Sequence, residues 1–441
     1  MSLTRRDVLK ALAVPGLAGL TGIGAAGCGS RPTVRVAVVW SGWELSQFTK
    51  VMSAFSDRYG YGYTIESMGD DTFAFLSNEV TVDSQPDVAL VPQPDLVRAS
   101  APRLAALDWP GPDAPAWRPL LYGRGGGGGQ YGVWFKAAYE SMVWHRDDLP
   151  APGGGWTWDR WVEQCRALAR AGHPPLAIGA ADGWVLAGWF ANVLLSIDPA
   201  GYRTLTARYS SGRAAGNGPS WDIGSVREAL TRLATMWQID GAFPGGPERA
   251  LVTQFDQAVL DVFAEGRAAM VMGADFFWPI ITQDTSFPAG RVRWFPFPSR
   301  PPEKTPIIVA GDAAVLFGRS AASPGSRQLV GWLATPDAAR IWAGAGGFLS
   351  INDQVTQDDY PYPPGMRPAE LIARVQQGSP DGGPATFDLA DELGGPLGGG
   401  DGQGTWKIFT DFFTDVAVRR SSVPAAIAKV TNALDHAVGG S

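Results

Sequence analysis

The chain has 441 residues, which is more than one ordinary hydrophobic core accommodates and enough for two domains. Apolar residues make up 45% of the chain and charged residues 18%, a balance that is typical of globular proteins and excludes a disordered chain. The net charge of −7 offers no basic surface for nucleic acid or an anionic membrane, so we expect no nucleic-acid partner.

The N-terminus predicts an export signal. Arg5 and Arg6 lie in TRRDVLK, which is similar to the twin-arginine export motif, and a run of small and apolar residues follows. This run is too short for a membrane span, and Pro15 interrupts it. It ends in AAGC, which resembles a lipobox, so we expect cleavage of residues 1–27 and lipidation of Cys28 at the outer face of the cell membrane. The alternative is an uncleaved leader beside an ordinary cysteine.

Strand-like and helix-like segments alternate after Cys28. The apolar run VRVAVVW (residues 34–40) is typical of a buried parallel strand, and ELSQFTKVMSAFSDRYG (residues 44–60) has apolar residues at helical spacing. YTIESM (63–68) and QPDVALVP (85–92) are further strand candidates. This alternation predicts an α/β fold with helices on both faces of a sheet. Ligands bind beyond the carboxyl ends of such strands, which here are residues 40–44, 69–71 and 93–95.

No sequence pattern points to a metal, cofactor or nucleophile site. The glycines of GRGGGGGQYG are not followed by Gly-Lys-Ser/Thr, so we interpret them as a connection and not as a phosphate loop. Cys165 lies in a helical pattern that Thr157 would cap; it has no disulfide partner if Cys28 is lipidated, and we expect it in the core. The polar, glycine-rich residues 378–404 predict a long mobile surface loop. The histidines are too scattered for a zinc site: His145, His173 and His436.

Several segments, taken in order, carry a family resemblance. The most specific are FAEGRAAMVMGADFFWP (residues 263–279) and TWDRW (157–161), which follows the extended segment YGVWFKAAYESMVWHRDDLP (131–150). With the first strand and helix and residues 311–352, they span most of the mature chain. The chain resembles the extracellular solute-binding proteins of carbohydrate ABC importers, the group that includes maltose-binding protein. Within that group it is similar to the UspC-type sugar and amino-sugar lipoproteins of high-GC Gram-positive bacteria.

The resemblance implies a two-lobed periplasmic-binding-protein fold with an interlobe ligand cleft. One lobe would comprise residues 34–136 and 308–350, and the other residues 140–305 and 351–441, with hinge segments between them. The lobes would close on a carbohydrate, as hinged domains do, and deliver it to the transmembrane subunits of an ABC permease. The resemblance also implies a monomeric binding protein without a cofactor or a catalytic residue.

The resemblance places candidate ligand-binding residues at the cleft. In this family the strand AAMVM ends at the cleft, and rings beyond it would stack on the apolar face of a sugar while carboxylates and amides bind its hydroxyl groups. Trp278 is the preferred stacking platform. The alternative is that the rings belong to the core and that the acids are helix caps or solvated charges. The candidates are Glu44, Asp71, Gln93, Trp184, Asp275, Phe276, Trp278, Gly311, Asp312 and Trp406.

Two other functions stay open at this point. An exported, acidic, ring-rich protein could be a glycoside hydrolase, but no motif places two carboxylates about 5–10 Å apart across a sugar bond. A binder of a glycerophosphodiester-type solute would need cationic groups in the cleft, where the matching positions are acidic or aromatic. We therefore expect a carbohydrate-binding protein and not an enzyme.

Overall fold

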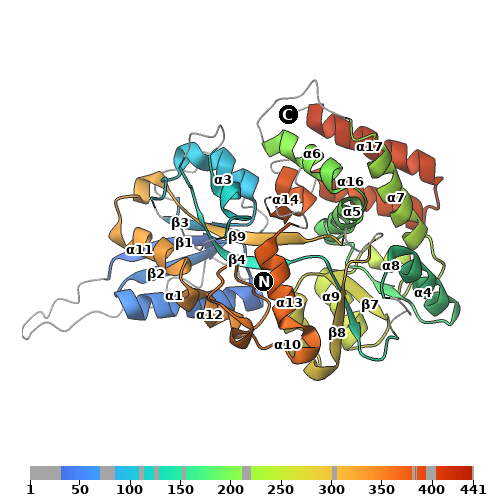
Figure 1. Ribbon diagram of the computed structural model, residues 1–441, viewed down its shortest axis with the longest axis horizontal. Coiled ribbons are helices and arrows are strands. Elements are labelled where there is room, and N and C mark those ends of the chain that lie inside the picture. Colours follow the sequence, from blue (N-terminus) through green and yellow to red (C-terminus); the bar gives the residue numbers. More distant parts are fainter. Residues whose placement is uncertain are drawn as a thin grey trace, which may run out of the picture.

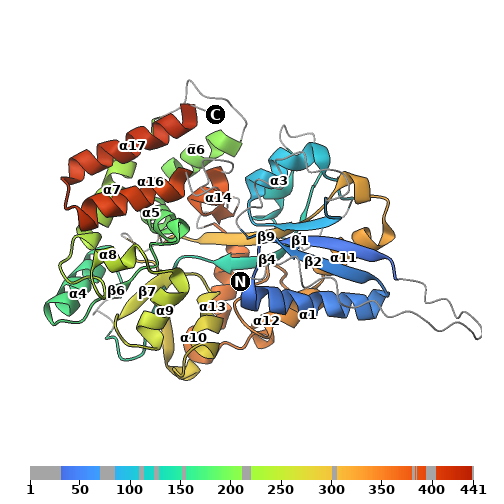
Figure 2. The same cartoon turned by 180° about the vertical axis from the view of Figure 1, so that it is seen from behind.

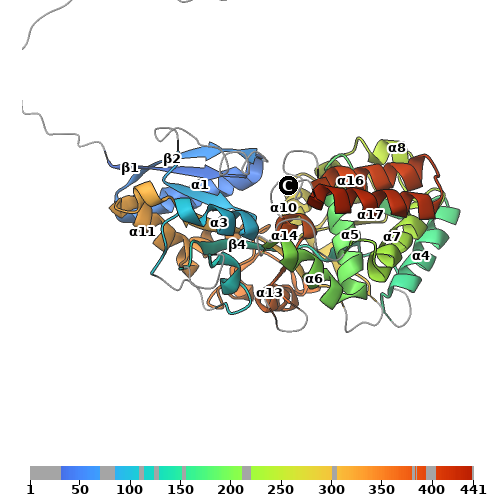
Figure 3. The ribbon, with the colours of Figure 1, turned by 90° about the horizontal axis from the view of Figure 1, so that it is seen from above.

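The chain folds into two lobes that lie side by side (Figure 1, Figure 3). The structure is a computed structural model, and it describes residues 31–69, 85–108, 114–123, 129–150, 155–210, 220–299, 305–379, 383, 385–393 and 404–439. The expected signal peptide, Cys28 and Asp71 lie outside these residues. Each lobe combines a sheet with flanking helices, so the two-lobed α/β fold expected from the sequence is confirmed.

The first lobe is built on a mixed sheet. Its strands are β1 (Thr33–Val38), β2 (Gly62–Ser67), β3 (Val88–Val91), β4 (Val133–Tyr139), β9 (Ile308–Leu316) and β10 (Thr386–Phe387). The order is β10-β9-β3-β1-β2, with β4 also paired to β9. β1 is parallel to β2 and β3, whereas β9 is antiparallel to β3 and β4.

Helices cover both faces of this sheet, with α3 on one side and α1 and α12 on the other (Figure 1). They are α1 (Gly42–Tyr59), α3 (Pro94–Ser100), α11 (Pro324–Leu333) and α12 (Pro336–Ala343). Helix α1 buries its apolar stripe, which includes Phe48, Met52 and Phe55. It ends at Gly60, which adopts a left-handed conformation with φ of 76° that glycine tolerates best.

The second lobe is mainly helical. Its sheet has the order β6-β7-β5-β8, formed by β5 (Met142–Arg146), β6 (Leu176–Ala177), β7 (Met270–Gly273) and β8 (Val292–Pro296). Thr157 caps α4 by accepting a hydrogen bond from the Arg160 N–H, and Cys165 is buried, as the sequence predicts. The helices are α4 (Trp158–Arg170), α5 (Gly183–Ile197), α6 (Pro199–Ser210), α7 (Gly224–Trp237), α8 (Pro247–Ala250), α9 (Phe255–Phe263), α10 (Phe277–Gln283), α16 (Gly404–Phe413) and α17 (Val423–Gly439).

The chain crosses between the lobes more than once. Strand β4 leads through Glu140 and Ser141 into β5, and β9 returns from the second lobe to pair with β4. Helix α13 (Pro368–Gln377) packs on β4, and α14 (Leu389–Leu393) then lies between α3 of one lobe and α5 and α6 of the other (Figure 2). Of the lobe limits expected from the sequence, residue 136 lies within β4 and residue 140 directly follows it.

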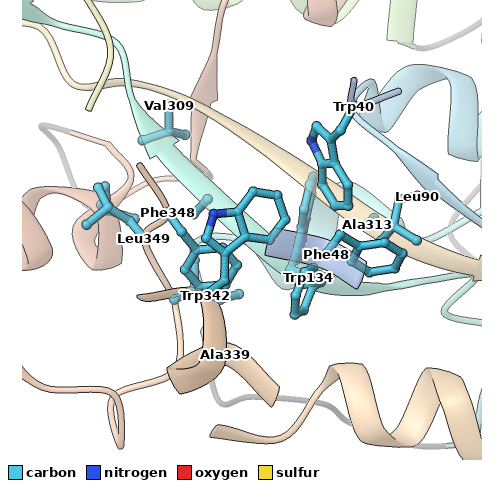
Figure 4. Close-up of a cluster of buried hydrophobic side chains, with 14 of the residues drawn as sticks. Trp40, Phe48, Leu90, Trp134, Val309, Ala313, Ala339, Trp342, Phe348 and Leu349 are labelled. Carbon is cyan, nitrogen blue, oxygen red and sulfur yellow. The ribbon is translucent and has the colours of Figure 1, made fainter. Parts of the chain in front are cut away.

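One hydrophobic core continues across the junction of the lobes. In the first lobe Trp342 is fully buried and packs against Trp40 and Phe348 (Figure 4). The same cluster includes Phe277 and Trp278 of the second lobe.

Among the described residues, no helix is both long enough and apolar enough to cross a membrane.

Candidate functional site

Three of the predicted residues converge on a lysine in the seam between the lobes. Lys136 lies on β4, directly opposite Asp312 on β9, and it forms an ion pair with Glu44 in the first turn of α1. Asp275, which follows β7 of the second lobe, is close enough to raise the pKa of Lys136. The seam thus holds one ammonium group among three carboxyl groups from different elements.

Aromatic rings surround this lysine. Lys136 is 5% exposed, and its Nζ lies 5.1 Å from the ring centre of Trp342, 5.6 Å from Trp40 and 5.7 Å from Phe276. Ammonium groups at such distances are attracted to the faces of aromatic rings. Phe276 belongs to the second lobe, so Lys136 contacts both lobes. Lys136 is not among the predicted residues, although a lysine inside the apolar run GVWFKAAY is an unusual feature that points to a buried partner.

Burial and the charges of neighbouring residues shift the pKa values of Lys136 and its acids in opposite directions. Burial by itself would lower the pKa of Lys136, but Glu44 and Asp312 outweigh it and the pKa is raised. Burial raises the pKa of Asp275 to about 7, against the opposing effects of the Tyr139 N–H and Lys136. It also raises the pKa of Asp312 to about 7, again against Lys136. These carboxyl groups therefore change charge close to neutral pH.

Asp275 lies at the end of a buried strand, as expected, and it links two elements. It is 0% exposed, and its Oδ1 accepts a hydrogen bond of 2.9 Å from the N–H of Tyr139 at the end of β4. Its Oδ2 has no hydrogen-bond partner within the described part of the chain. A buried carboxyl oxygen without a partner is costly in its charged form, which agrees with the raised pKa of Asp275.

The structure separates the three rings that follow Asp275. Trp278 is 3% exposed and packs edge-on against Tyr362 at 5.3 Å between ring centres, over Gly346. Trp278 therefore lies in the core, which is the alternative that the sequence left open for these rings. Phe276 is half-buried and lies 6.1 Å from the ring of Trp184, which is also half-buried. Phe276 is thus the one partly exposed ring of the three, and Trp184 and Trp406 are the other half-buried candidate rings.

Four further carboxyl groups lie at the same seam, and we call them the hinge carboxyl cluster: Glu140, Asp388, Asp391 and Glu392. Glu140 follows β4, Asp388 follows β10, and the other two lie in α14. Burial is the main cause that raises the pKa of each, to about 6 for Asp388 and to about 7 for Glu392. The side chain of Gln93, a predicted residue that precedes α3, lies close enough to Asp391 to lower its pKa against the effect of burial.

This cluster was not predicted, because the glycine-rich residues 378–404 indicate one long loop. That interpretation is wrong for residues 386–393, which contain β10 and α14. The apolar side chains of Phe387 and Leu389 are fully buried and fix this short segment against both lobes. In the sequence, the acids of DLADEL lie next to these apolar residues, and this pattern could have indicated the cluster.

Gly311 and Trp406 occupy tightly packed positions. A Cβ atom at Gly311 would lie 2.8 Å from the Lys136 carbonyl oxygen and 2.9 Å from the Trp117 ring, so only glycine lets these groups approach. Trp406 packs its Cβ against Gly183, beside Trp184 at the start of α5. Gly311 therefore shapes the seam through packing, and Trp406 borders it.

Other features of the described chain lie apart from this seam. A hollow of about 610 Å³ is lined by residues such as Arg146 and His173, and one of about 390 Å³ by residues such as His145 and Trp156; neither contains a predicted ligand-binding residue. Among the described residues, no group of three His, Cys, Asp or Glu side chains is arranged to hold a metal ion.

A two-lobed α/β fold with acids and half-buried rings in the interlobe seam defines the class of receptors that hold a solute between two domains. The profile of the family described as bacterial extracellular solute-binding protein matches residues 74–340, and the chain belongs to this family. The family consists of binding proteins and not of enzymes. The narrower UspC-type assignment stays a prediction.

Individual relatives agree with this assignment. The chain is 26% identical over 400 residues to the osmoprotective compounds-binding protein GgtB of Synechocystis sp., covering 86% of this chain and 89% of the relative. It is 22% identical over 413 residues to the alpha-glucosides-binding periplasmic protein AglE of Rhizobium meliloti, covering 86% and 83%. The solved structure of the bacterial solute receptor AcbH shares the fold, with a TM-score of 0.71 at 14% identity over 92% of this chain and 98% of that one.

Proposed function

We propose that this protein captures a carbohydrate between its lobes and delivers it to the membrane subunits of an ABC importer. The observation that carries the proposal is the pairing of half-buried rings on the second lobe, Phe276 and Trp184, with the acids around Lys136 on the first. Rings suit the apolar face of a sugar, and carboxylates suit its hydroxyl groups. The names of the relatives, which refer to α-glucosides and osmoprotective compounds, support the same class of solute.

The candidate roles differ from residue to residue. Phe276 and Trp184 would stack on the sugar, and Gln93 and Glu44 would bind hydroxyl groups from the first lobe. Asp275 and Asp312 would act indirectly, because their buried carboxyl groups stabilise the charged Lys136 in its position. The glycerophosphodiester alternative has less support, because Lys136 is already paired with Glu44.

Replacing Trp184 with alanine is expected to weaken sugar binding by about 1–3 kcal/mol, the usual loss when an aromatic anchor is removed. The sugar for this test is the one that raises the melting temperature most in a screen of monosaccharides, disaccharides and polyols. Calorimetry would measure the affinity. Trp156→Ala is the matched control, because that ring stacks on Phe295 at 4.0 Å elsewhere in the second lobe. Equal affinities for both variants and the wild type would remove Trp184 from the site.

We also propose that lipid on Cys28 holds the mature protein at the outer face of the cell membrane. The proposal is supported by the basic residues Arg5 and Arg6, the apolar run that follows them and the AAGC motif. Cys28→Ala should move the protein from the membrane fraction to the soluble fraction of cells, as immunoblots of the two fractions would show. Retention of the variant in the membrane fraction would contradict lipid anchoring. Cys165→Ala is the control, since that cysteine is buried in α4.

A further inference from the structure

The edge of the second lobe's sheet carries the hollow of about 390 Å³, apart from the seam. Strand β8 is an edge strand of this sheet, because β5 is its one partner among the described strands. The hollow is lined by His145 of β5, Arg293 of β8, Trp156 before α4 and Arg367 before α13. None of the described residues that line it is acidic, so the hollow is positively charged.

Two guanidinium groups are fixed beside β8. Nη1 of Arg293 donates to the carbonyl oxygens of Gly290 and Val292 at 2.7 and 2.8 Å, and Nη2 of Arg367 donates to that of Trp294 at 3.1 Å. Val292 and Trp294 are two residues apart, which is about 7 Å along a strand. Carbonyl oxygens orient a guanidinium group without neutralising its charge, and each of the two groups retains further N–H donors for a ligand.

Arg293 lacks a counter-charge. It forms no ion pair with a carboxylate in the described part of the chain, whereas the nearby Arg291 and Arg367 pair with Asp147 and Glu370. The capping of backbone carbonyl groups therefore explains the hydrogen bonds of Arg293 but leaves its charge unbalanced. An anion in the hollow would balance it.

Aromatic rings adjoin these cations. Trp156 is half-buried and stacks on Phe295, with 4.0 Å between ring centres and 9° between ring planes. The guanidinium group of Arg367 lies 4.8 Å from the ring centre of Trp294. Flat apolar surfaces beside cations suit a ligand that joins a planar ring to an anionic group. The volume of the hollow is near the lower end of the range for small-molecule sites, about 300–1,000 Å³, and therefore suits a single ring.

His145 adds a buried hydrogen-bond acceptor to the hollow. It is 7% exposed, and its Nδ1 lies 2.7 Å from the carbonyl oxygen of Arg146. Burial lowers the pKa of His145 to about 4, and the charge of Arg293 acts in the same direction, so the imidazole is neutral at pH 7. Because a carbonyl oxygen only accepts, Nδ1 carries the proton and Nε2 is left as an acceptor. Nε2 has no partner within the described residues, and a donor on a ligand would satisfy it.

We propose that this hollow is a second ligand site, which binds an aromatic carboxylate that carries a hydroxyl group. The carboxylate lies between the guanidinium groups of Arg293 and Arg367, the ring contacts Trp156, and the hydroxyl group donates to Nε2 of His145. Guanidinium and carboxylate groups form strong, charge-assisted hydrogen bonds. Inorganic phosphate would use the cations but not the rings, and a neutral sugar would leave the charge unbalanced. The site is separate from the seam, so it does not depend on the proposed carbohydrate function.

Calorimetry at pH 7 with the wild-type protein tests the proposal through matched probes. These are the three hydroxybenzoate isomers, benzoate, cyclohexanecarboxylate, the hydroxybenzamides and inorganic phosphate. We expect one hydroxybenzoate to bind one-to-one and at least about 10-fold more tightly than its uncharged amide, because the amide lacks the charge that pairs with the guanidinium groups. It should also bind more tightly than benzoate, which lacks the donor for His145, and benzoate more tightly than cyclohexanecarboxylate. Failure of every hydroxybenzoate to bind, or equal binding of the amide or of phosphate, would overturn the proposal.

Variants then locate the ligand. Arg293→Gln and Trp156→Ala should each weaken binding of the hydroxybenzoate at least about 10-fold, as the loss of a charged or aromatic contact does. His145→Phe keeps a ring but removes the acceptor, so hydroxybenzoate and benzoate should then bind equally. Trp184→Ala is the control, since that ring lies in the seam beside Phe276, and it should leave the affinity unchanged. Loss of binding in Trp184→Ala but not in Trp156→Ala would place the anion in the seam and contradict a second site.

Discussion

Replacing Lys136 with methionine is expected to lower the free energy of unfolding by roughly 3 kcal/mol at pH 8, within the range for breaking a buried ion pair from one side. Methionine keeps the apolar stem between Trp40 and Trp342 but removes the positive charge. Asp275 and Asp312 are then left buried without a counter-charge. Chemical denaturation followed by tryptophan fluorescence would measure the loss.

The same variant should be much less affected at pH 5. Asp275 and Asp312 have pKa values of about 7 in the folded chain, against an ordinary 3.8. Between these values the folded chain keeps protons that the unfolded chain releases, so each group costs stability as pH rises toward 7. Without Lys136 their pKa values rise further and the cost grows. A destabilisation that does not depend on pH would contradict this account, and Lys407→Met, at an exposed ion pair, should have little effect at either pH.

Trp342→Ala is expected to lower the free energy of unfolding by about 3–5 kcal/mol, the usual range for removing a fully buried ring. Trp342 is 0% exposed and lies 4.9 Å from the ring of Trp40 and 5.4 Å from that of Phe348 (Figure 4). The variant leaves a cavity and also removes one ring beside Lys136. Trp342→Phe, which fills part of that space, should lose less. Equal stability of the alanine variant and the wild type would show that this cluster does not organise the first lobe.

Local patterns were sufficient for much of the fold. The apolar run at residues 34–40 contains β1 except for Thr33, the helical spacing at residues 44–60 contains most of α1, and residues 85–92 contain β3. Burial of apolar side chains determines both the sequence pattern and the element, on one face of α1 and on both faces of β3. The crossing between lobes was also predictable, since β4 and β5 lie in the extended segment at residues 131–150.

Side-chain direction at the strand end was not predictable from the sequence. A turn after β7, in which Phe277 N–H bonds to Ala274 O and Trp278 N–H to Asp275 O, directs Trp278 into the core. The space it fills is provided by Gly346 and Tyr362, which are distant in sequence. The hinge carboxyl cluster depends in the same way on contacts between distant segments, because Glu140 and Asp388 meet only after the lobes assemble. Neither of these contacts can be predicted from the sequence of one segment alone.

The central claim is that the seam between the lobes binds a carbohydrate and leaves it unchanged. Native mass spectrometry of the protein after incubation with a panel of neutral and amino sugars tests both parts at once. We predict a saturable one-to-one complex whose added mass is that of the intact sugar, with Trp184→Ala reducing its population and Trp156→Ala leaving it unchanged. The absence of any sugar complex, or the appearance of masses that correspond to cleaved sugars, would contradict the claim.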